Sequence, residues 1–69
     1  MEDEKEKLIT LLNYLIEHNT DHSTELTELA GNSEIAASDL VRSNIREAAR
    51  MMTESTEYLK QALAEVRKD

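Results

Sequence analysis

Leucines recur along the first part of the chain at alternating intervals of three and four residues. We name the positions that share this spacing the leucine–histidine row; it consists of Leu8, Leu11, Leu15, His18, His22, Glu25 and Leu29. Alternation of three and four residues is typical of one face of an α-helix that packs against another helix. The pattern therefore predicts a helix over residues 3–30 with this row as its packing seam.

The second part of the chain carries two further rows with a seven-residue repeat. One row is large and apolar and consists of Ile45, Met52, Leu59 and Val66; the other, which we name the small row, consists of Val41, Ala48, Ser55 and Ala62. Large and small residues on neighbouring rows suit close helix packing, and Ala49 and Leu63 widen the apolar surface on the flanks. We predict a helix over residues 34–67 with both rows at its seam.

Gly31 is the single glycine of the chain, and there is no proline. We predict a turn over 31–33, in which Gly31 takes the left-handed conformation after the first helix and Ser33 caps the second. An alternative is a break near residue 20, because residues 19–23 have poor helix propensity. A continuous first helix is favoured, since its apolar register runs without a phase slip from Leu8 to Leu29.

These elements predict an all-α, single-domain protein over residues 1–69, folded as a two-helix antiparallel hairpin. Apolar residues also flank the predicted seam, among them Ile9, Leu12, Ile16, Leu26 and Met51. One hairpin cannot cover so much apolar surface, so we expect a homodimer that forms an antiparallel four-helix bundle. A chain of 69 residues without cysteine also needs reinforcement from a metal or a partner subunit.

Acidic residues dominate the charge of the chain, which is −7 with an isoelectric point near 4.7. This balance opposes binding to nucleic acid or to an anionic membrane surface. No signal peptide is recognised, and no apolar run approaches the roughly 20 residues that span a bilayer. A cytoplasmic location is the expectation.

His18 and His22 are the strongest candidates for chemistry. A spacing of four residues places both imidazoles on one helix face, where they are able to share a transition-metal ion such as Ni²⁺ or Zn²⁺. Glu25, one turn further on, is a possible oxygen ligand. A tight turn makes residues whose numbers sum to about 64 face each other, which places His18 near Ile45 and Arg46 and His22 near Arg42. Further ligands are therefore expected from the histidines of a second copy.

The histidines also permit two readings without a metal. Polar residues on a packing seam are able to fix register and pairing, in which case the protein is a structural or protein-interaction module that binds a partner through an apolar helix face. Alternatively, the histidines become charged as the pH falls, and their repulsion loosens an interface. An enzyme is not expected, because the chain has no recognisable catalytic triad or phosphate-binding loop, and so small a hairpin offers little enclosed space.

The segment from Leu11 to His22, with His18-Asn19-x-x-His22 as its distinctive part, resembles a small prokaryotic helical family of unknown function. The hallmark of that family is Leu-Leu-x-His-Trp-Ile-x-His-Asn-x-x-His followed by an alanine-rich helix. The family occurs alone or beside domains similar to the nickel-binding accessory protein of carbon monoxide dehydrogenase. The resemblance implies a role with nickel or another transition metal, although Tyr14 and Leu15 stand where the family has His and Trp.

Overall fold

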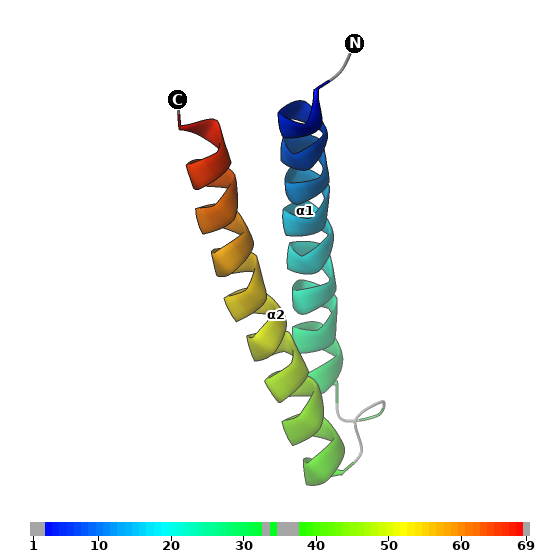
Figure 1. Ribbon diagram of the computed structural model, residues 1–69. Coiled ribbons are helices and arrows are strands. Elements are labelled where there is room, and N and C mark those ends of the chain that lie inside the picture. The colour runs from blue at the N-terminus through cyan, green and yellow to red at the C-terminus, as the bar shows by residue number, and fades with distance from the viewer. Residues whose placement is uncertain (1–2, 33, 35–37, 69) are drawn as a thin grey trace.

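A computed structural model describes residues 3–32, 34 and 38–68. It contains two helices, α1 (Glu4–Ala30) and α2 (Asp39–Arg67), which run antiparallel and place both chain ends at the same end of the molecule (Figure 1). The Cα atoms extend over 51 × 19 × 11 Å, so the molecule is one helix layer thick. The prediction of an all-α hairpin is confirmed.

Helix α1 is continuous through residues 19–23, so the alternative with a break near residue 20 is wrong. The threonine hydroxyls of this region hydrogen-bond to the backbone one turn earlier: Thr20 Oγ1 donates to Ile16 O at 2.7 Å, and Thr24 Oγ1 donates to Thr20 O at 3.1 Å. At the N-terminus, Asp3 caps the helix by accepting from the Glu6 amide at 2.8 Å.

The connection between the helices differs from the predicted tight turn. Helix α2 begins at Asp39 rather than 34, because the side chain of Ser38 caps it by accepting from the Val41 amide at 3.1 Å. The predicted cap, Ser33, lies outside the described residues. Gly31 has φ −82° and ψ −9°, so the predicted left-handed conformation is wrong. Its amide donates to Thr27 O at 3.2 Å and to Glu28 O at 3.1 Å, so the helix ends here without a positive φ.

The residues that α1 turns toward α2 form a row shifted by one position from the leucine–histidine row. Every member of this inner seam is buried or half-buried; it consists of Ile9, Leu12, Ile16, Asn19, Ser23, Leu26 and Ala30. The predicted seam of α1 is therefore wrong by one residue, which corresponds to a rotation of about 100°. Leu8, Leu11 and Leu29 of the predicted seam are 42%, 52% and 39% exposed.

Helix α2 uses one predicted row and one flanking row. The large row at Ile45, Met52, Leu59 and Val66 is half-buried against α1 as expected. The second row of the seam contains buried Ala49, Thr56 and Leu63 in place of the small row, whose Val41 is 45% exposed. The small row therefore lies beside the seam, as the leucine–histidine row does on α1.

Candidate functional site

Hydrogen bonds between the helices fix which residues face each other. Ser23 Oγ donates to Ala49 O at 3.2 Å and lies 3.0 Å from Thr53 Oγ1. The numbers of facing residues therefore sum to between 72 and 76, instead of about 64. The difference follows from the longer connection between Ala30 and Asp39.

This alignment overturns the predicted neighbours of the histidines. His18 does not face Ile45 and Arg46, and His22 does not face Arg42, because the corresponding stretch of α2 lies near residues 50–58. Both histidines also lie outside the inner seam: His18 is exposed and His22 is half-buried.

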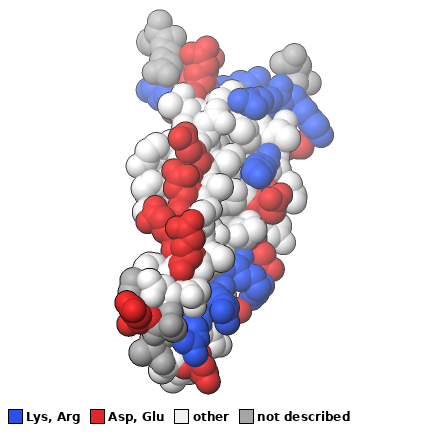
Figure 2. All heavy atoms as spheres, turned by 180° about the vertical axis from the view of Figure 1, so that it is seen from behind, with Lys and Arg blue, Asp and Glu red and all other residues white. Residues whose placement is uncertain are grey.

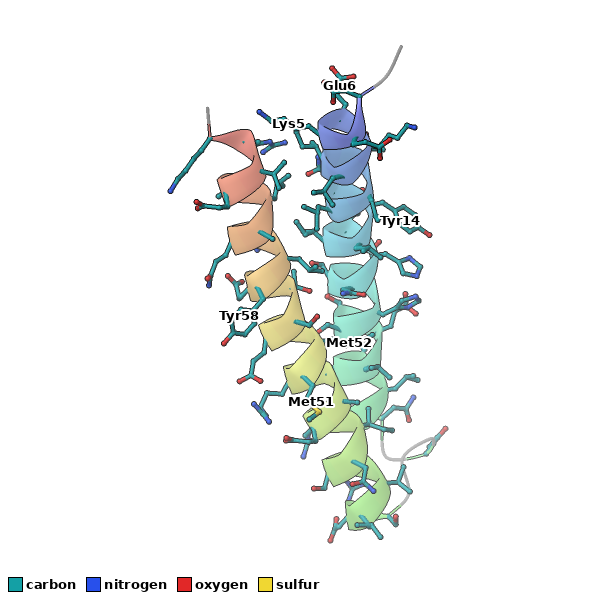
Figure 3. The ribbon with its side chains drawn as sticks, viewed as in Figure 1. Lys5, Glu6, Tyr14, Met51, Met52 and Tyr58 are labelled. Atoms are coloured by element: carbon teal, nitrogen blue, oxygen red, sulfur yellow. The ribbon has the colours of Figure 1, made fainter. Side chains whose placement is uncertain are left out.

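The two imidazoles contact each other directly. His18 Nε2 and His22 Nε2 are 3.0 Å apart, and the rings meet edge to face with centroids 4.3 Å apart and an angle of 82° between their planes. Tyr14, which Figure 3 shows on the side of α1 away from α2, stacks on His18 with centroids 5.3 Å apart and an angle of 15°. A row of three ring side chains therefore follows one side of α1.

Glu25 lies on the other side of the His22 ring. Its Oε1 is 3.6 Å from His22 Nδ1, whereas the contact with His18 uses Nε2. A carboxylate at the second nitrogen of an imidazole orients the ring and fixes its tautomer in many metal sites. This position suits support of His22 more than direct contact with an ion shared by the two Nε2 atoms.

The spacing of the two Nε2 atoms fits a shared metal ion. Metal–nitrogen bonds of about 2.0–2.1 Å place two ligands on one ion about 2.9 Å apart at a right angle and about 3.3 Å apart in a tetrahedron. The observed 3.0 Å lies between these values. Among the described residues, however, no group of three His, Cys, Asp or Glu side chains is arranged to hold a metal. One chain supplies two ligands of the four that a closed site uses.

Sequence reasoning missed a polar cluster inside the hairpin. Thr56 is 5% exposed and donates to Met52 O at 2.8 Å, while Ser23 and Thr53 bond across the helices. These residues line a shallow groove together with Thr20, Thr24, Glu57 and Lys60. The available signal was the recurrence of serine and threonine at intervals of three or four residues, at Thr20, Ser23 and Thr24 on α1 and at Thr53 and Thr56 on α2.

Both helices carry charged side chains on the face that Figure 2 shows. Acidic side chains form a column along α1, and basic side chains interspersed with acidic ones follow α2. On α2, Arg50 pairs with Glu47 and, at 2.9 Å, with Glu54. The hydrogen bond and charge of Arg50 lower the pKa of Glu47, and Glu47 in turn raises the pKa of Arg50. These ion pairs connect residues of one helix and do not involve the histidines.

Neither helix in the described part of the chain is long and apolar enough to cross a membrane. No curated protein and no solved structure matches the sequence. Residues 8–66 match the family described as a domain of unknown function, DUF8180. Because the match covers most of the chain, including both histidines and the whole inner seam, this protein belongs to the DUF8180 family.

Proposed function

We propose that this protein is a small, non-enzymatic transition-metal-binding or metal-handling protein of the cytoplasm, with Ni²⁺ or Zn²⁺ as its ion. His18 and His22 provide the ligands, and Glu25 supports His22. The observation that carries the proposal is the 3.0 Å separation of the two Nε2 atoms, which suits two nitrogens on one ion. The resemblance of the His18-Asn19-x-x-His22 segment to a family associated with nickel accessory domains also favours nickel.

Native mass spectrometry of the untagged protein, with and without equimolar Ni²⁺ or Zn²⁺, tests this function. A tag is avoided because polyhistidine binds both metals. We expect uptake of a stoichiometric ion at low micromolar protein, and loss of that uptake in the double variant His18→Ala, His22→Ala.

A matched control separates ligation from general attraction of cations to an acidic protein. Glu65 is an exposed carboxylate near the C-terminal end of α2, far along the hairpin from both histidines. Glu65→Gln should therefore leave the affinity within about twofold, since surface charge contributes little at physiological salt. If the double histidine variant binds nickel and zinc as tightly as the unchanged protein, the proposed site is wrong.

A second candidate function is a structural or protein-interaction module, in which the histidines set pairing and bind no metal. The observation in its favour is the exposed apolar surface along both helices, including Leu11 at 52% and Met51 at 57% exposure. The two functions differ in the dependence of folding on metal. A metal-handling site stabilises the fold when the ion is added, whereas the melting temperature of an interaction module is unaffected by Ni²⁺, Zn²⁺ or a chelator.

A further inference from the structure

The hairpin leaves more surface exposed than a folded monomer of its size. Its accessible area is 5310 Å², whereas a folded monomer of 7.9 kDa exposes roughly 4,400 Å². The excess of about 900 Å² is close to the roughly 800 Å² that each partner buries in a standard protein–protein interface. The area available for a partner is therefore that of one ordinary interface.

Part of the exposed apolar surface lies on one face of the hairpin, whereas Tyr14, Leu40 and Tyr58 are exposed elsewhere. On each helix the exposed row precedes a row of the inner seam by one residue: Leu11 precedes Leu12, and Ala48 precedes Ala49. When two helices pack antiparallel, the residues that precede the seam residues by one position point to the same side of the pair on both helices. The leucine–histidine row and the small row therefore share a face, which we name the apolar face. The charged columns of Figure 2 occupy the opposite face.

The pattern on α1 reads similarly in both directions about residue 20. Leu11 and Leu29 lie nine positions on either side of it, and His18 and His22 lie two positions on either side. When α1 packs antiparallel on its own copy with the crossing at residue 20, Leu11 meets Leu29 and His18 meets His22, while Leu15 lies opposite Glu25. A twofold axis produces this pairing.

The pattern on α2 has a centre of its own, at Ser55. Ala48 and Ala62 lie seven positions on either side of it, so two copies of α2 approach closely through small side chains when they cross there. The alignment of the hairpin places residue 20 of α1 opposite residues 52–56 of α2. The centre on α1 and the centre on α2 are thus at the same level of the molecule, as a single twofold axis requires.

We propose that a second copy of this chain docks on the apolar face, with α1 antiparallel to α1 and α2 antiparallel to α2 about an axis at the level of residue 20 of α1 and Ser55 of α2. In this four-helix arrangement the His18–His22 pairs of the two copies meet at the axis. Four imidazoles then surround one point, which completes a set of four ligands of which the described residues of one chain supply two. The use of the four imidazoles for a metal rests on the proposed function, whereas the apolar pairing does not.

Cysteine cross-linking tests the position of the axis, because the natural chain has no cysteine. Ser55→Cys places the thiols of two copies beside the proposed axis, where the helices are close enough for a disulfide. Gln61→Cys is the matched control, since this exposed position on α2 points away from the inner seam and from the apolar face. The oxidant is diamide rather than a copper complex, because copper binds imidazoles.

We expect the Ser55→Cys variant to form a covalent dimer at least about tenfold faster than Gln61→Cys, because thiols within one dimer have an effective concentration far above the micromolar bulk value. Equal rates for the two variants overturn the proposal. So does sedimentation of the unchanged protein as a monomer at micromolar concentration.

The same protein samples separate the dimer from the metal. Selective cross-linking at position 55 without uptake of Ni²⁺ or Zn²⁺ supports the interface and contradicts the metal function. Metal uptake with no preference for position 55 contradicts the interface and leaves the histidine pair as the ligand set of another assembly.

Discussion

Ser23 makes the hydrogen bonds by which one helix recognises the other in the described part of the chain. Its hydroxyl donates to Ala49 O and contacts Thr53 Oγ1. In a hairpin with few fully buried residues, such a directional contact selects one alignment among several with similar apolar packing. The serine thus fixes the level at which the histidines of α1 lie relative to α2.

Replacement of Ser23 by alanine should destabilise the hairpin by about 1 kcal/mol, the usual net value of a hydrogen bond. Ser43→Ala is the control, because Ser43 is an exposed residue within α2 and undergoes the same change in helix propensity. Urea denaturation of both variants gives the comparison. Equal free energies of unfolding for the two variants would show that the contact across the helices contributes nothing.

Glu25 allows a second test with a single side chain. Its carboxylate lies at Nδ1 of His22 and not beside the two Nε2 atoms. We expect Glu25→Gln to weaken Ni²⁺ or Zn²⁺ binding by roughly 10- to 100-fold, as the loss of an orienting partner does. Isothermal titration calorimetry of the Glu25→Gln and His22→Ala variants measures the two losses of affinity. A loss as large as that of His22→Ala would make Glu25 a direct ligand.

The sequence alone predicted the histidine pair and its carboxylate, because contacts over three or four residues follow from helix geometry. It did not predict the buried hydroxyls of Ser23 and Thr56. Serine and threonine are common on exposed helix faces, so their burial depends on which way each helix turns. That rotation is a property of the helix pair and not of a local pattern.

At the scale of the elements, the sequence predicted both helices and their antiparallel order but chose the wrong face of α1. Two rows with the same spacing run side by side on this helix, and the leucine–histidine row has four leucines where the inner seam has two. The leucine repeat favours the first row, whereas the number of apolar residues favours the inner seam by only one, five against four. A helix with two apolar rows offers two packing surfaces, and periodicity does not say which of them the other helix of the same chain covers.

The sequence pattern also did not determine the residue at which α2 begins. Ser33 and Ser38 are both suitable caps, each followed by an acidic residue. The structure uses Ser38, and this choice changes the residues that face each other. The choice of the capping serine therefore changes which residues face each other along the whole hairpin.

Helix α2 is stabilised on its exposed side by the Arg50 cluster, which gives a pH prediction. Arg50 lowers the pKa of Glu47 in the folded protein, so the contribution of this pair to stability is present above the ordinary carboxyl range and is lost as the pH falls through the lowered pKa. Arg50→Gln should return the pKa of Glu47 toward its usual value. A carboxyl NMR titration measures the shift, and an unchanged titration would show that the ion pair does not persist in solution.

At the scale of the whole molecule, a single layer of two helices has two faces to be covered or solvated. Charged and hydroxyl side chains cover one face (Figure 2), while the leucines and alanines of the apolar face lie on the other, together with His18, His22 and Ser55. Leu8, Leu11 and Leu29 lie outside the inner seam and remain exposed, at positions where a self-sufficient hairpin has polar residues. A second layer on this face would cover them.

The dependence of thermal stability on protein concentration tests this conclusion. Association with a second copy raises the melting temperature as the protein concentration increases. The unchanged protein should therefore melt at a higher temperature at about 200 micromolar than at about 2 micromolar. Leu11→Asn should abolish this dependence, because Leu11 belongs to the apolar face. Leu40→Asn should retain it, although Leu40 is the more exposed leucine at 71% against 52%, because Leu40 lies on neither row. A dimer that tolerates Leu11→Asn and is lost with Leu40→Asn would place the contact on the outer side of α2 and contradict the apolar face as the interface.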